Sequence, residues 1–123
     1  MHSKNADFAA EKITEWNQLA ISIRSGEHPD AAHLIFRYLD LGSEIASISD
    51  KDAQRWIYHR MLEQLENTIC DSLIAKHWRE NCANNLYRPL YMLAQMAESA
   101  KEKQESRKLS REAYRQCKYF LSN

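Results

Sequence analysis

The sequence predicts an all-α protein, a compact bundle of four to five mostly antiparallel helices. Long stretches carry apolar residues at spacings of three and four, the period that places them on one face of a helix. Only two glycines and two prolines occur among the 123 residues, so few turn signals interrupt these stretches. The length and the 44% of hydrophobic residues suit a single domain over residues 1–123, with a disordered tail at residues 1–5.

The first helix is predicted over residues 6–24, and Gly26 follows it where a helix end favours the left-handed conformation. A second helix is predicted over residues 29–46, with Pro29 in its first turn, where the missing N–H costs nothing. Gly42 lies inside this helix and either costs it about 1 kcal/mol or ends it. We favour a continuous helix. The apolar face of the first helix consists of Ile13, Trp16, Leu19, Ala20 and Ile23.

Residues 15–36, which would join these two helices into a hairpin, carry a further pattern. It consists of Trp16, Leu19, Ala20, Gly26, Ala32 and Phe36. The pattern resembles a single tetratricopeptide-type repeat. No second copy follows at the spacing of about 34 residues, and a solenoid needs about three copies. We therefore interpret the segment as a generic pair of antiparallel helices and assign no family.

A central helix is predicted over residues 49–78, a stretch without glycine or proline. Ser49 followed by Asp52 suits an N-cap with an acidic first turn, and three asparagines shortly after Trp78 favour the end of the helix. Its apolar residues recur at every fourth position, so the row turns slowly around the helix and meets different neighbours along its length. This row consists of Ala53, Ile57, Met61, Leu65, Ile69 and Leu73.

Two further helices complete the predicted bundle. The fourth is expected to begin near residues 85–88, ahead of an apolar face with the same spacing. Residues 101–111 are almost wholly polar, and a new apolar face starts at Leu109 in a different phase. We expect a tight turn near residues 104–107. The alternative is one long helix whose middle is surrounded by solvent.

The net charge is zero, but the charges are unevenly placed. Residues 1–100 contain 10 Lys/Arg and 14 Asp/Glu, a balance of −4, whereas residues 101–123 contain 7 and 3, a balance of +4. On the last helix the cations form one arc and the apolar residues another. Such an arc favours contact with a partner. This first candidate contact surface consists of Arg107, Lys108, Arg111, Arg115 and Lys118.

An aromatic patch is the second candidate contact surface. Tyr87 and Tyr91 are four residues apart, with Arg88 between them, so a helix places the two tyrosines on one face. Tyrosine and arginine are favoured where proteins bind one another. We therefore expect Tyr87, Arg88 and Tyr91 to contact the same partner or a second one.

No pattern in the sequence predicts catalysis, a metal or a cofactor. Cys70, Cys82 and Cys117 are odd in number and far apart, which suits a reduced cytoplasmic protein better than a disulfide scaffold. Zinc sites use close ligand pairs, and His77 is two helical turns from Cys70. A pair of Cys82 and His77 would lack an oxyanion hole and an orienting group, and two distant glycines cannot form a phosphate loop.

The remaining function classes are narrowed by elimination. No run approaches the roughly 18 apolar residues of a membrane span, and no signal-peptide pattern opens the chain. We therefore expect a non-enzymatic protein-binding module: an adaptor, a small chaperone or a regulator of another protein. A homodimer that joins the acidic body to the basic end is a further prediction. The alternative is a small regulator that contacts DNA or RNA through the basic arc, although an isoelectric point near 7.0 is low for that class.

Overall fold

The computed structural model describes residues 4–122 of the chain, with side chains from residue 9 onward. This part contains no strand and six helices, so the all-α prediction is confirmed. Of the predicted tail, Lys4 and Asn5 belong to the first helix, and residues 1–3 lie outside the described part. The helices are α1 (Lys4–Ser25), α2 (His33–Ser47), α3 (Lys51–Ile69), α4 (Lys76–Asn84), α5 (Tyr87–Met96) and α6 (Ala100–Leu121).

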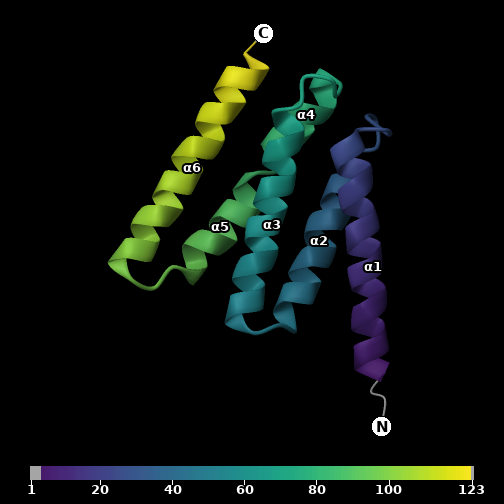
Figure 1. Ribbon diagram of the computed structural model, residues 1–123, viewed down its shortest axis with the longest axis vertical. Helices are drawn as coiled ribbons and strands as arrows, with labels where there is room; N and C mark the ends of the chain where they lie inside the picture. The colour runs from purple at the N-terminus through teal and green to yellow at the C-terminus, as the bar shows by residue number, and fades with distance from the viewer. Residues whose placement is uncertain (1–3, 123) are drawn as a thin grey trace.

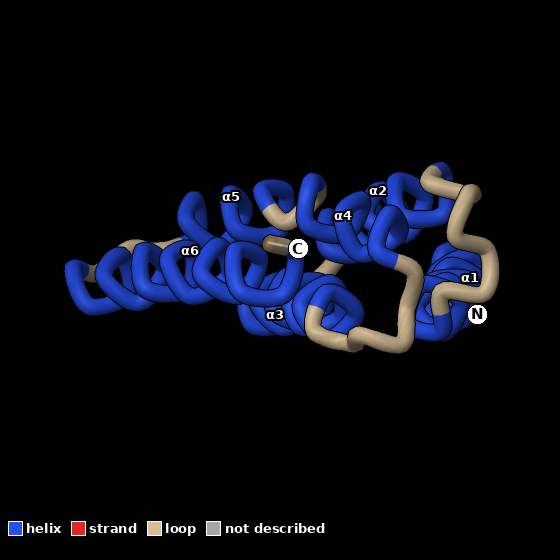
Figure 2. The backbone as a smooth tube through the Cα atoms, turned by 90° about the horizontal axis from the view of Figure 1, so that it is seen from above, coloured by secondary structure: helices blue, strands red, loops and turns tan. Residues whose placement is uncertain are grey.

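The helices run up and down beside one another (Figure 1). α1, α2 and α3 alternate in direction, α5 runs back along α3, and α6 returns towards the level of α4. Seen from above, α2, α4 and α5 lie on one side of a layer formed by α1, α3 and α6 (Figure 2). α3 packs against all five other helices, which confirms its predicted central place.

The core is built around the buried side of α3. Its apolar row is buried from Ile57 to Ile69. Beside it, the ring of Trp16 on α1 stacks on the ring of Tyr38 on α2, with 5.4 Å between the ring centroids. Each fully buried side chain of this size contributes roughly 1.5–3 kcal/mol through removal of apolar surface from water. The core therefore forms mainly where α1, α2 and α3 meet.

Gly42 lies inside a continuous α2, as predicted, and the structure gives a reason for the absent side chain. A Cβ atom at this position would overlap the terminal methyl group of Met61 and lie 2.9 Å from Nε1 of Trp16. The glycine therefore allows α2 to approach α1 and α3 closely. Gly26, with a φ of 63°, takes the left-handed conformation at the end of α1, also as predicted.

The predicted start of the second helix at Pro29 is wrong, because α2 begins at His33. The N–H of Ala31 donates to the carbonyl oxygen of His28 across a turn. Pro29 is the second residue of that turn, a position for which its fixed φ is well suited. A proline that fits the first turn of a helix thus serves here in the connection before it.

The predicted helix over residues 49–78 is wrong at both its middle and its end: residues 70–75 separate α3 from α4, and α4 continues past Trp78 to Asn84. Asp71 explains the break. Its Oδ1 accepts a hydrogen bond from the N–H of Leu73 at 3.0 Å, and its Oδ2 accepts one from Nη1 of Arg24 at 2.8 Å. A carboxylate that bonds to the backbone two residues further on forms a turn. Leu73, which was predicted on the apolar row, is consequently 92% exposed.

The start of α3 also differs from its prediction by one residue. Asp50, and not Ser49, is the N-cap, and its side chain accepts a hydrogen bond from the N–H of Ala53 at 2.9 Å. α5 begins at Tyr87, inside the window predicted for the fourth helix. Capping chemistry therefore places the start of α3 to within one residue, whereas α5 has no side-chain cap.

The predicted turn near residues 104–107 is wrong, because α6 is continuous and the turn lies at residues 97–99. The Ser99 side chain accepts from the N–H of Glu102 at 3.1 Å, and the Glu102 carboxylate accepts from the N–H of Ser99 at 3.2 Å. This reciprocal capping box starts α6 before the change of apolar phase. The polar stretch is thus largely the solvent-facing side of a helix.

Candidate functional site

The five predicted cations of the last helix lie on the solvent side of α6, and we call them the basic face. All five side chains are exposed, whereas Ala113 of the same helix is fully buried. α6 packs against α3, α4 and α5, so its opposite side is open. The basic face consists of Arg107, Lys108, Arg111, Arg115 and Lys118.

No cation of the basic face forms an ion pair with a carboxylate among residues 9–122. α6 also carries three carboxylates, those of Glu102, Glu105 and Glu112. Glu102 is 3.3 Å from Nη2 of Arg55 on α3. Burial, and then the nearby charge of Glu112, raise the pKa of Glu66 on α3. Glu112 follows Arg111 directly and is four residues from Lys108, but no ion pair joins it to either of them among the described residues.

The arginines in the rest of the chain are all engaged. Five of them pair with carboxylates at N–O distances between 2.7 and 3.6 Å. These are Arg24, Arg37, Arg55, Arg60 and Arg88. The sixth, Arg79, donates to three backbone carbonyl oxygens. The arginines that form no internal hydrogen bond or ion pair among the described residues therefore all lie on α6.

The aromatic patch lies on α5 and lines a groove between α2, α3 and α5 of about 360 Å³. Tyr87 and Tyr91 are 59% and 60% exposed there. Arg88 lines the same groove, but its Nη2 is 2.7 Å from Oδ1 of Asp40, so its charge is compensated within the molecule. The structure brings the two tyrosines together, as their spacing predicts, but on a different helix from the basic face.

A third surface was not predicted from the sequence, and we call it the α1–α3 groove. It has a volume of about 860 Å³ and runs between α1, α3 and residues 70–75, with Tyr38 of α2 on its floor. Ile21 is 69% exposed along it. The lining residues come from four separate segments, so no local pattern could reveal the groove. The one available signal was Ile21, an isoleucine outside the apolar face of the first helix.

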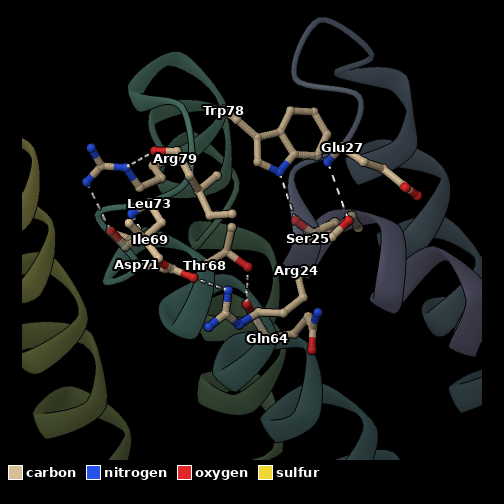
Figure 3. Close-up of polar contacts among 12 residues, drawn as sticks. Arg24, Ser25, Glu27, Gln64, Thr68, Ile69, Asp71, Leu73, Trp78 and Arg79 are labelled. Atoms are coloured by element: carbon tan, nitrogen blue, oxygen red, sulfur yellow. Dashed lines mark hydrogen bonds and ion pairs between the residues drawn. The ribbon is translucent and has the colours of Figure 1, made fainter.

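Polar contacts fix one end of this groove (Figure 3). The ion pair between Arg24 and Asp71 joins α1 to residues 70–75. Nε1 of Trp78, at the start of α4, donates to the carbonyl oxygen of Ile23 at 2.9 Å. Because these contacts connect α1 with α4 and with the break between α3 and α4, the end of the groove is held in place.

The cysteine thiols of the described residues are poorly suited to nucleophilic chemistry. Burial raises the pKa of Cys82 to about 12 and also raises those of Cys70 and Cys117, whereas a reactive cysteine needs a lowered pKa. His77, the imagined partner of Cys82, instead lies 3.1 Å from Oδ1 of Asp30. No three metal-binding side chains gather in the part of the chain that the structure describes. No helix in the described residues is long and apolar enough to cross a bilayer.

Comparisons of the chain with protein-family models, with curated proteins and with solved structures find no match. The pair formed by α1 and α2 packs as the hairpin expected over residues 15–36. This local agreement does not define a family. The function is therefore argued from the three surfaces described above.

Proposed function

We propose that this protein is a non-enzymatic protein-binding module, an adaptor, small chaperone or regulator, that docks on an acidic surface of another protein through the basic face. One observation carries the proposal. The arginines from Arg24 to Arg88 have partners within the molecule, whereas the cations of the basic face have none among the described residues. Unpaired cations on one helix face attract and orient a partner of opposite charge.

The expected energies are modest and depend on salt. Each exposed contact between a cation and a carboxylate contributes about 0.2–1 kcal/mol, so five such contacts contribute at most a few kcal/mol. Ions screen these contacts over a Debye length of about 8 Å at physiological ionic strength. The face should therefore govern the association rate and partner choice more than the lifetime of the complex. Tyr87 and Tyr91 would add a contact that depends less on charge.

The experiment is a capture of partners from the native lysate with three forms of the chain, followed by mass spectrometry. The forms are the unchanged chain, the double variant Arg111→Glu/Arg115→Glu, and the control Lys101→Glu/Lys103→Glu. Lys101 and Lys103 are exposed on the same helix but lie outside the basic face. Both double variants replace two cations with two glutamates, so they have the same net charge. A partner lost only with the first variant supports the proposal. A partner retained by both variants removes the basic face as the docking surface.

The same unpaired cations favour a second candidate, a small regulator that contacts the phosphates of DNA or RNA. Affinity that comes from phosphate contacts falls steeply with salt, by several orders of magnitude between about 50 and 200 mM for six to ten contacts. A gel shift with a short DNA duplex and a short single-stranded RNA at low salt separates the candidates. Salt-sensitive binding in that assay supports the second candidate, and an unshifted probe at low salt removes it.

A second copy of the chain is a further proposed partner. The balance of −4 over residues 1–100 complements the basic face of another copy. A dimer held in this way should dissociate as salt is raised. Sedimentation equilibrium at low and high salt measures this directly, and a monomeric mass at low salt contradicts the homodimer.

A further inference from the structure

Two buried polar atoms of residues that line the α1–α3 groove have no partner in the described part of the chain. They are the indole Nε1 of Trp16 and the hydroxyl of Tyr38. Trp16 is 5% exposed and Tyr38 is 0% exposed. Buried polar groups of native proteins nearly always have a hydrogen-bond partner, and an exception needs an explanation. Nε1 of Trp16 lies against Gly42 of α2, so a ligand in the α1–α3 groove would supply a partner for the Tyr38 hydroxyl.

Both atoms call for an acceptor. The indole N–H can only donate. Burial raises the pKa of Tyr38, the charge of Arg60 lowers it and that of Glu63 raises it; burial dominates, so the hydroxyl keeps its proton at neutral pH. Arg60 lines the same groove. Its pair with Glu63 has an N–O distance of 3.6 Å, and its side chain is 44% exposed, so its guanidinium is open to a second anion. A hydroxyl donor beside a cation suits a carboxylate.

The rest of the groove is suited to an apolar side chain. Ile21, Leu73 and Ile74 line it, and the first two are exposed. Trp16 and Arg24, at the two ends of the α1 wall, are eight residues apart, which is about 12 Å of helix. An extended peptide covers this length with about four residues.

We propose that the α1–α3 groove binds an extended segment of a partner protein that carries a carboxylate close to a large apolar side chain. The carboxylate accepts from the Tyr38 hydroxyl beside Arg60, and the apolar side chain packs against Ile21 and Leu73. This site goes beyond the proposed function, because it lies on α1 and α3 and makes no use of the basic face of α6.

The test uses the full chain as bait for a phage-displayed library of random 12-residue peptides. The expected enriched peptides carry Asp or Glu within about four residues of Leu, Ile, Met or Phe. One enriched peptide is then synthesised together with its amide version, Asp→Asn or Glu→Gln. Titration calorimetry should show binding at least tenfold weaker for the amide version, because a charge-assisted hydrogen bond is lost.

Variants separate a binding role from a structural one. Tyr38→Phe removes a hydroxyl that has no internal partner, so it should leave the unfolding temperature unchanged or raised. It should weaken binding of the peptide about tenfold. Ile21→Glu places a charge where the apolar side chain of the peptide packs, so it should also weaken binding of the peptide. The control is Ile48→Glu, since Ile48 is equally exposed, at 67%, at the end of α2. It should bind normally.

A spectroscopic readout locates the peptide. The indole N–H signal of Trp16, assigned with Trp16→Phe, should move on addition of the peptide in a ¹⁵N–¹H spectrum. The variant Arg111→Glu/Arg115→Glu should bind the peptide as the unchanged chain does. The proposal for this groove and the proposal for the basic face are therefore tested independently. The proposal is overturned if no acidic and apolar peptides are enriched. It is also overturned if binding is insensitive to Tyr38→Phe and Ile21→Glu, or is lost with the α6 variant alone.

Discussion

The same guanidinium group is buried at Arg79 on α4 and exposed at Arg111 on α6. Arg79 is 9% exposed and donates to the carbonyl oxygens of Ile69, Ile74 and Phe120, so it joins the C-terminal ends of α3 and α6 to α4. Cations near such ends interact favourably with the helix dipole. Arg111 is exposed and makes no such bond. The difference teaches that position, and not residue type, decides whether a positive charge here stabilises the fold or remains available to a partner.

Truncation of the buried arginine should have the largest effect. Arg79→Ala leaves three carbonyl oxygens without their donor, and we expect it to lower the free energy of unfolding by about 3 kcal/mol. Arg111→Ala removes no internal bond and should change it by no more than about 0.5 kcal/mol. Urea unfolding followed by circular dichroism measures both. Equal losses for the two variants would break the comparison.

Packing in the interior is tested by Gly42→Ala. In a free helix this change is expected to stabilise by about 1 kcal/mol. Here the added methyl group meets Met61 and Trp16, so we expect a net loss of about 2 kcal/mol. Ser47→Ala, on the exposed end of the same helix, is the control and should be nearly neutral. A Gly42→Ala chain more stable than the original would show that α1, α2 and α3 are not closely packed at this point.

The Arg24–Asp71 pair should make the free energy of unfolding depend on pH, whereas the basic face should not. The hydrogen bond from Arg24, and then that from the Leu73 N–H, lower the pKa of Asp71. Its contribution to stability is therefore present above the unfolded pKa of about 3.9 and is lost as the pH falls through the lowered folded value. Asp71→Asn should flatten the fall in unfolding free energy between about pH 5 and pH 2. Arg111→Gln should leave that slope unchanged, and a matching change in its slope would count against the distinction.

The smallest change in stability is expected for Arg111→Glu/Arg115→Glu. Neither side chain has an internal partner among the described residues, so the unfolding free energy should stay within about 0.5 kcal/mol of the original. Far-ultraviolet circular dichroism should show the same helix content. A large destabilisation would mean that these arginines belong to the fold after all.

The positions of the helices were largely predictable because they depend on local patterns. The apolar rows placed α1, α3 and α5, and Gly26 took the left-handed conformation expected of it, whereas the close packing at Gly42 was not predicted. The break at residues 70–75 was missed because it depends on Arg24, 47 residues before Asp71 in the chain. The start of α6 was missed although its signal, Ser99 followed by Glu102, stands in the sequence.

The candidate surfaces divide in the same way. The basic face follows from the period of one helix, but its lack of internal carboxylate partners is a property of the folded chain. The compensation of Arg88 by Asp40 likewise joins residues that are 48 apart. The α1–α3 groove combines α1, α2, α3 and residues 70–75, so only the tertiary structure assembles it.

The most direct test of the central claim is the affinity of a captured partner for the unchanged chain, for Arg111→Glu/Arg115→Glu and for Lys101→Glu/Lys103→Glu. Titration calorimetry at about 50 and 500 mM salt spans weak and strong screening. The account predicts that the basic-face variant binds at least tenfold more weakly than the control at low salt, and that this difference shrinks at high salt. Equal affinities of the two variants at both salt concentrations would contradict it.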